Sequence, residues 1–170
     1  VASCGAATAA AEPRSLGART LATDGMELRD GESIEASIAR LDELDETHLA
    51  LGQEMLQAFD GAMYGMDLLA VGALNRSKAH IAGFRQLVHG KNMICAGALL
   101  RLQLDTALRF HAAWLVAQPH DFALAVLRGD RVRNMKDRSG KKMTDAYLVE
   151  VLGREHPWVP RVYERTSGYV

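Results

Sequence analysis

The sequence predicts an all-α fold, a helical bundle of about five or six helices, from three observations. Apolar residues recur at every third or fourth position along most of the chain, which is the period of an amphipathic helix. No segment shows the strict alternation of apolar and polar residues that marks a half-buried strand. Residues 92–117 are apolar on almost every side of a helix, as in the interior of a bundle. We therefore expect the other helices to pack around a buried central helix at 92–117.

The length and composition predict one folded domain preceded by a tail. A chain of 170 residues buries about 70% of the surface that it exposes when unfolded. Residues 1–31 are rich in Ala, Gly, Ser and Thr without a lasting helical period, so we expect a disordered tail there. Residues 32–170 form the predicted single α-helical domain. We expect this domain to be truncated at its C-terminus, because its last segment carries no helix-stop signal.

The first two helices are predicted from their end signals. Ser33 is a good N-cap for a long amphipathic helix, which we expect to run to the break at Asp60–Gly61. Its acidic residues lie mostly opposite its apolar face. A second helix is expected over residues 62–89, where Gly90 ends it.

The remaining helices are shorter, apart from the central one. Asn92 starts the central helix, which must end before Pro119 because a residue that precedes proline avoids helical geometry. A short helix over residues 121–127 is expected to end at Gly129.

The C-terminal part is predicted to contain a loop and two further helices. Residues 128–142 read as loop, with a turn at 137–140. Thr144 is expected to open a helix that ends by Gly153, and residues 162–170 to begin another.

The charges are distributed unevenly although the net charge is only −1. Residues 21–60 hold eleven acidic and two basic side chains, a balance of −9. Residues 127–142, here called the basic segment, have a balance of +5. Such a segment can be a solvated loop, or it can hold phosphate or a nucleic-acid backbone. Its cations are Arg128, Arg131, Arg133, Lys136, Arg138, Lys141 and Lys142.

Three charged residues interrupt the apolar central helix. Arg101, Asp105 and Arg109 are spaced i, i+4, i+8 and lie within a stripe roughly 80° wide. If the stripe is buried, the carboxylate should be paired with both guanidiniums, since an unpaired buried charge is costly. This buried charge cluster either fixes the register of the helix or lends one arginine to a small anionic ligand. The same three charges make a membrane span improbable.

The cysteines and histidines point to no cofactor. Cys95 is expected to pack as a small apolar residue, and Cys4 falls in the predicted tail. Two unpaired cysteines fit a reducing cytoplasm, the location that we predict. The six histidines are scattered, so we predict neither a metal site nor another cofactor.

Three stretches carry a resemblance to known proteins: LLRLQLDTALRFHAAW at 99–114, KDRSGKKMTDAYL at 136–148 and PWVPRVYERTSGYV at 157–170. With them, residues 76–170 resemble a group of bacterial helical proteins that have no established activity. The resemblance covers a little over half of the chain and implies a fold class.

More distantly, the architecture is similar to HEPN domains, helical bundles of toxin–antitoxin and abortive-infection systems, many of which are metal-independent RNases. Their hallmark is an arginine followed a few residues later by a histidine, both side chains meeting across a dimer. Arg165 stands where that arginine is expected, and the sequence ends at Val170, where the histidine is expected. The pairs Arg76–His80 and Arg85–His89 have only three intervening residues and do not fit.

The resemblance implies a dimeric, RNA-interacting protein, with RNase activity in a toxin or phage-defence system as its strongest form. Arg165 would then stabilise the phosphate in the transition state, and the basic segment would hold the RNA backbone. One alternative is a non-enzymatic module that binds a partner protein through its acidic first helix and basic loop. The other is a binder of a small anionic ligand beside Arg101 and Arg109.

Overall fold

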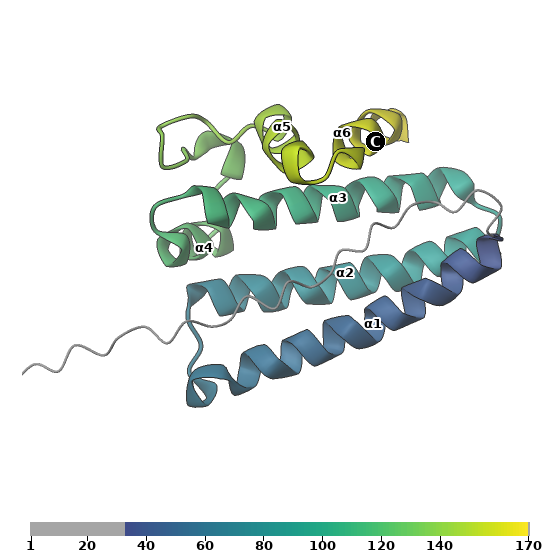
Figure 1. The fold of residues 1–170 in the computed structure, drawn as a ribbon, viewed down its shortest axis with the longest axis horizontal. Helices are drawn as coiled ribbons and strands as arrows, with labels where there is room; N and C mark the ends of the chain where they lie inside the picture. Colours follow the sequence, from purple (N-terminus) through teal and green to yellow (C-terminus); the bar gives the residue numbers. More distant parts are fainter. Residues whose placement is uncertain (1–32, 170) are drawn as a thin grey trace, which may run out of the picture. The chain divides into compact units, whose positions relative to one another are not determined.

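The computed structural model describes residues 33–169 as a bundle of six α-helices, so the all-α prediction is confirmed (Figure 1). The predicted tail at residues 1–31 lies outside the described residues. No helix in the described part combines the length and the hydropathy that a membrane span needs. The helices are α1 Ile34–Gln57, α2 Gly65–His89, α3 Met93–Leu115, α4 Pro119–Leu127, α5 Asp145–Glu155 and α6 Trp158–Thr166, with 3-10 turns at η1 Ala58–Gly61, η2 Val132–Asn134 and η3 Ser167–Tyr169.

The central position predicted for the helix at 92–117 is confirmed, because α3 contacts helices on both of its sides. In this part of the chain α1, α2 and α3 lie side by side, and α5 and α6 cover the side of α3 that faces away from α2 (Figure 1). Helix α4 packs on α2 and α3. The buried core lies between α3, α4, α5 and α6 and consists of Leu104, Leu108, Ala112, Ala113, Val116, Phe122, Val132, Met143, Leu148, Leu152 and Val159.

The first turns of α3 are less buried than their apolar sequence predicts. Met93 is half exposed and Ile94 is 71% exposed. Cys95 is also exposed, so the prediction that it packs as a small apolar residue is wrong. In these turns Ala96 is 3% exposed, and the next buried residue of α3 is Leu104. Apolar residues on all sides of a helix therefore do not guarantee burial along its whole length.

Three helices begin where a polar side chain was predicted to cap them. The side chains of Ser33, Asn92 and Thr144 each accept a hydrogen bond from the backbone N–H three residues ahead, at 3.2, 3.2 and 3.4 Å. The predicted break after α1 is present as well, since Asp60 and Gly61 have φ angles of +53° and +81°. Short polar residues thus cap the start of α1, α3 and α5, and a left-handed turn follows α1.

The last two helices differ from the prediction at their ends. Helix α5 runs past Gly153 to Glu155, and α6 begins at Trp158 instead of residue 162. Pro160 fits inside the first turn of α6, because the N–H groups there have no acceptor within the helix. A Cβ atom on Gly153 would lie 2.8 Å from Cγ of Pro160. This glycine therefore serves the close packing of α6 on α5 and does not end the helix.

Candidate functional sites

The charge cluster on α3 consists of a partly buried pair and a more exposed arginine. Nε of Arg101 donates to Asp105 at 3.1 Å, and their side chains are only 11% and 14% exposed. Nη2 of Arg109 lies 4.0 Å from the other carboxylate oxygen of Asp105, and this side chain is 46% exposed. Asp105 thus has one close ionic partner, and Arg109 adds a weak one.

Arg101 also connects α3 to the end of α6. Its guanidinium carbon lies 3.6 Å from the centre of the Tyr163 ring, and Nη1 donates to Oγ of Ser167 at 2.8 Å. Nη1 also approaches the backbone oxygen of Tyr163 at 3.4 Å. Since these contacts engage Nε and Nη1 of the guanidinium, the geometry favours a link between helices over a pocket for an anionic ligand.

The basic segment is folded around Asp137. Within it, residues 136 and 142 form an antiparallel bridge, and the turn between them contains Gly140 at a φ of +87°. The carboxylate of Asp137 accepts from Oγ of Ser139 at 2.7 Å and from the Tyr147 hydroxyl at 2.6 Å. These bonds hold the pKa of Asp137 far below its usual range, and the bond from Tyr147 contributes most. The same bond raises the pKa of Tyr147. The predicted turn at 137–140 is confirmed, and we call residues 136–142 the hairpin.

Arg138 fastens the hairpin to the end of α3. Its backbone N–H and Nε both donate to the carbonyl of Leu115, at 2.9 and 3.2 Å, and Nη2 donates to the carbonyl of Trp114. A cation at these carbonyls satisfies acceptors that the helix leaves open and suits the negative end of its dipole. Arg138 was predicted to hold phosphate, but its guanidinium is committed to this structural contact.

Most of the other cations of the basic segment face solvent. Lys141 is exposed as well but has partners, because it lies 4.1 Å from the Tyr147 ring centre and 3.9 Å from a carboxylate oxygen of Glu150. Lys136 and Lys142 are exposed and stand directly opposite each other in the bridge. Five cations are exposed without an ion pair or side-chain hydrogen bond between residues 33 and 169: Arg128, Arg131, Arg133, Lys136 and Lys142.

Arg165 is exposed in the last turn of α6, far from the basic segment. The end of α6 is fixed to α3 at Arg101, whereas the hairpin is fixed at Trp114. These positions are thirteen residues apart, which corresponds to about 20 Å along a helix. One chain therefore does not bring Arg165 and the hairpin into a common site.

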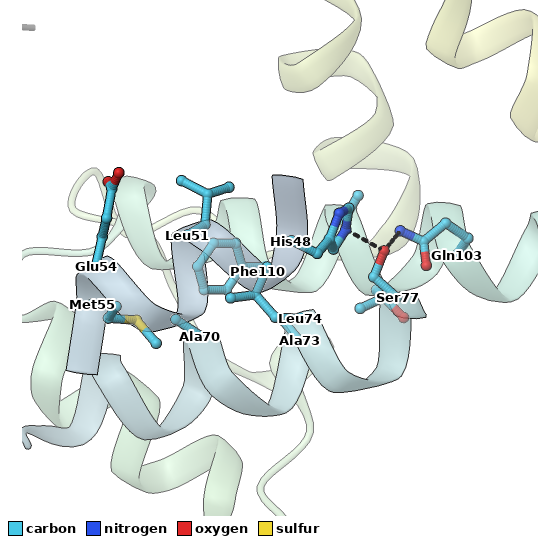
Figure 2. A pocket seen from close by; sticks show the side chains of 12 residues that line it. His48, Leu51, Glu54, Met55, Ala70, Ala73, Leu74, Ser77, Gln103 and Phe110 are labelled. Atoms are coloured by element: carbon cyan, nitrogen blue, oxygen red, sulfur yellow. Dashed lines mark hydrogen bonds between the residues drawn. The ribbon is translucent and has the colours of Figure 1, made fainter. Parts of the chain in front are cut away.

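A cleft of about 550 Å³ lies between α1, α2 and α3 (Figure 2). Most of its lining is apolar, and its polar residues at one end are His48, Ser77 and Gln103. Thr106 of α3 also lines the cleft, and its hydroxyl donates to the carbonyl of Leu102 at 2.9 Å. Glu54 lies toward the other end, six residues and about 9 Å further along α1. The apolar lining comprises Leu51, Met55, Ala70, Ala73, Leu74, Ala107 and Phe110.

A chain of hydrogen bonds runs through the polar end of the cleft. Nδ1 of His48 lies 2.6 Å from the carbonyl of Leu44, which can only accept, so Nδ1 carries a hydrogen. In the neutral ring Nε2 then accepts from Oγ of Ser77 at 2.8 Å. Ser77, which is 5% exposed, accepts in turn from Nε2 of Gln103 at 2.8 Å (Figure 2). The Oε1 atom of Gln103 accepts a hydrogen bond from Nδ1 of His80 at 2.9 Å.

Sequence reasoning missed this arrangement, which we call the polar chain. His48 and Gln103 lie 29 and 26 residues from Ser77, and a single sequence does not reveal which distant residues meet. One signal was present, because Ser77 falls between Leu74 and Ile81 on the apolar face of its helix. The pair Arg76–His80 was considered only as neighbours on one helix, whereas His80 turns toward α3.

One further histidine is half-buried outside the cleft. Nε2 of His111, on α3, is buried and has no hydrogen-bond partner within residues 33–169. Burial lowers the pKa of this ring, and the charge of Glu155 opposes the shift. No group of three or more His, Cys, Asp or Glu side chains in the described part of the chain is arranged to hold a metal ion.

Comparison with protein-family models, with curated proteins and with solved structures found no match to this chain. Its function is therefore inferred from the geometry of its own residues.

Proposed function

We propose that this chain is a cytoplasmic, RNA-binding helical protein of the HEPN-like kind, acting as a homodimer, whose basic segment contacts the RNA backbone. The observation that carries the proposal is the pairing of Lys136 with Lys142 across the hairpin. Like charges directly opposite each other in a ladder repel, and no carboxylate of the described residues pairs with either lysine. A phosphate between them would remove the repulsion.

The hairpin supports this function because it is held in place before any ligand binds. Asp137 closes its turn, and Arg138 attaches it to the end of α3. Exposed cations on a fixed segment lose little conformational freedom when they meet a polyanion. The nearby Arg128, Arg131 and Arg133 extend the cationic surface.

The test is the salt dependence of single-stranded RNA binding, followed by fluorescence anisotropy. Five phosphate contacts predict a log–log slope of about −3.5, because each contributes roughly −0.7. The double variant Lys136→Gln/Lys142→Gln should bring the slope to about −2. A matched control, Lys91→Gln/Arg161→Gln, removes two charges elsewhere and should leave the slope unchanged. A native protein that does not bind RNA at low salt would contradict the proposal.

RNA cleavage is the further step that Arg165 would serve. Its exposed guanidinium can stabilise the charge that develops on the phosphate during cleavage. Because Arg165 lies far from the hairpin, its substitution should affect cleavage without affecting RNA binding by the basic segment. We expect Arg165→Ala to abolish cleavage in EDTA without changing the salt slope. A native protein that binds but does not cleave would remove the nuclease from the proposal and leave RNA binding in place.

A protein-interaction module is the second candidate, and α1 is the observation that favours it. This helix has no buried residue among those described, yet it exposes Ile34, Leu44, Leu49, Leu51 and Leu56. A partner that covers these side chains would bury apolar surface that water now contacts. A partner-binding protein of this kind would show no RNA binding, so the same titration separates the two functions.

A further inference from the structure

The cleft between α1, α2 and α3 has the composition of a small-molecule site, with apolar walls and a few polar groups at one end. It is open to solvent on the side of α1, where Leu51 is 41% exposed. Phe110 and Leu74 face the space from the other two helices (Figure 2). An apolar molecule in this cleft would cover side chains from three helices at once.

The polar chain determines which group a ligand should present. Ser77 uses its only hydrogen on His48 and one lone pair on Gln103, so one lone pair of its oxygen remains. The amide nitrogen of Gln103 has two hydrogens, of which Ser77 accepts one. The polar end therefore offers one acceptor and one donor next to each other. A hydroxyl group matches both, because it donates to one and accepts from the other.

Charge limits the ligand further. Glu54 is the acidic residue that lines the cleft, and neither lysine nor arginine is part of its lining. A carboxylate or phosphate would find a single free amide hydrogen at the polar end and a like charge at the other. An anion is therefore the wrong ligand for this site, and an uncharged one is favoured.

We propose that the cleft binds an uncharged, mostly apolar molecule with one hydroxyl group, an alcohol or a phenol. Its hydroxyl group donates a hydrogen bond to Oγ of Ser77 and accepts one from the amide nitrogen of Gln103. Its apolar part lies along Leu51, Met55 and Phe110. This site is separate from the basic segment, so a failure to bind RNA and a failure to bind alcohol would each contradict only one of the two proposals.

The experiment titrates 1-octanol, heptyl methyl ether and octanoate into the intact protein. Binding is followed by NMR of ¹³C-labelled methionine methyl groups, since Met55 lines the cleft and the half-exposed Met93 does not. We expect Met55 to shift saturably with octanol while Met93 stays unchanged. The ether has the same number of heavy atoms but cannot donate, so it should bind about threefold to tenfold more weakly. Octanoate should bind more weakly than the ether.

Three variants locate the site. Ser77→Ala should lower octanol affinity to that of the ether without affecting the ether. Ala107→Phe fills the cleft from an exposed position of α3 and should abolish binding. Ala50→Phe adds the same ring on the exposed face of α1, away from the cleft, and should bind octanol normally.

The proposal fails if octanol gives no saturable shift of Met55 up to its solubility limit. It also fails if Ala107→Phe binds octanol as the native protein does, or if both phenylalanine variants lose binding. An octanol-to-ether ratio that survives Ser77→Ala would overturn the role of the polar chain.

Discussion

Helices α1 and α5 both pack against the long central helices, but they are held in different ways. Leu148 and Leu152 of α5 are buried in the core, at 0% and 7% exposure. Helix α1 is more than twice as long and has no buried residue among those described. Because a buried leucine contributes about 1.5–3 kcal/mol, the shorter helix is attached more firmly.

Helix α1 makes several polar contacts with α2. Asp42 pairs with Arg85, and Asp45 lies 3.7 Å from Lys78, all with side chains at least one-third exposed. Exposed ion pairs contribute about 0–1 kcal/mol each, so they add little to the hydrogen bond from Ser77 to His48. Stability is therefore concentrated on the α3–α6 side of the bundle, whereas the cleft lies under the weakly held α1.

The largest expected difference is between core and α1 leucines. Leu148→Ala should lower the free energy of unfolding by about 3 kcal/mol, because the surrounding core cannot fill the cavity. Leu49→Ala, on the exposed face of α1, should change it by less than about 0.5 kcal/mol. Urea denaturation measures both. Equal losses would show that α1 is part of the core.

The second prediction concerns the link between α3 and α6. Asp105→Ala should cost about 2–3 kcal/mol in urea denaturation, since it leaves the partly buried guanidinium of Arg101 without its carboxylate. Arg109→Ala removes the weaker and more exposed partner and should cost less than about 0.5 kcal/mol. If the two variants lost the same stability, the assignment of Arg101 as the principal partner would be wrong.

The third prediction uses two glycines of α2. A Cβ atom on Gly65 would lie 2.8 Å from the carbonyl oxygen of His120, so Gly65→Ala should destabilise the fold by about 1 kcal/mol or more. No atom lies within 4 Å of a Cβ on Gly72, and Gly72→Ala should stabilise by up to about 1 kcal/mol. Thermal denaturation should move in opposite directions for the two variants. A shift in the same direction would contradict the close packing of α2 on α4.

The smallest effect is expected from His111. Its pKa is lowered from 6.5 by burial, so the unfolded chain binds the proton more readily. Stability is therefore retained above pH 6.5 and falls as the pH drops below that value. The variant His111→Gln should lessen this fall relative to the exposed control His120→Gln, as measured by urea denaturation between about pH 7.5 and 5.5. An unchanged slope would show that another group is responsible.

Local signals in the sequence predicted the helices well, and long-range contacts account for what was missed. Ser33, Asn92 and Thr144 were recognised as caps because a cap depends only on the next few residues. Cys95 is exposed although the adjacent Ala96 is buried, and this difference depends on which side of α3 other elements cover, which no local pattern contains.

In the candidate sites, too, local features could be predicted and contacts between distant residues could not. The turn at Asp137–Gly140 was visible in the sequence, but the use of Arg138 as a cap for α3 was not, since its partners are over twenty residues away. The polar chain joins three helices through Ser77 and could not be assembled from one sequence without knowing their packing.

Native-state hydrogen exchange, read residue by residue, tests whether α1 is held more weakly than α3 and α5. Amides of α1 should exchange through an opening that costs several kcal/mol less than global unfolding, whereas those of α3 and α5 should approach the global value. Saturating 1-octanol should slow the exchange of α1 selectively, because it binds only when α1 forms the wall of the cleft. Protection of α1 equal to that of α5 would contradict the account of a firm core beneath a weakly held helix.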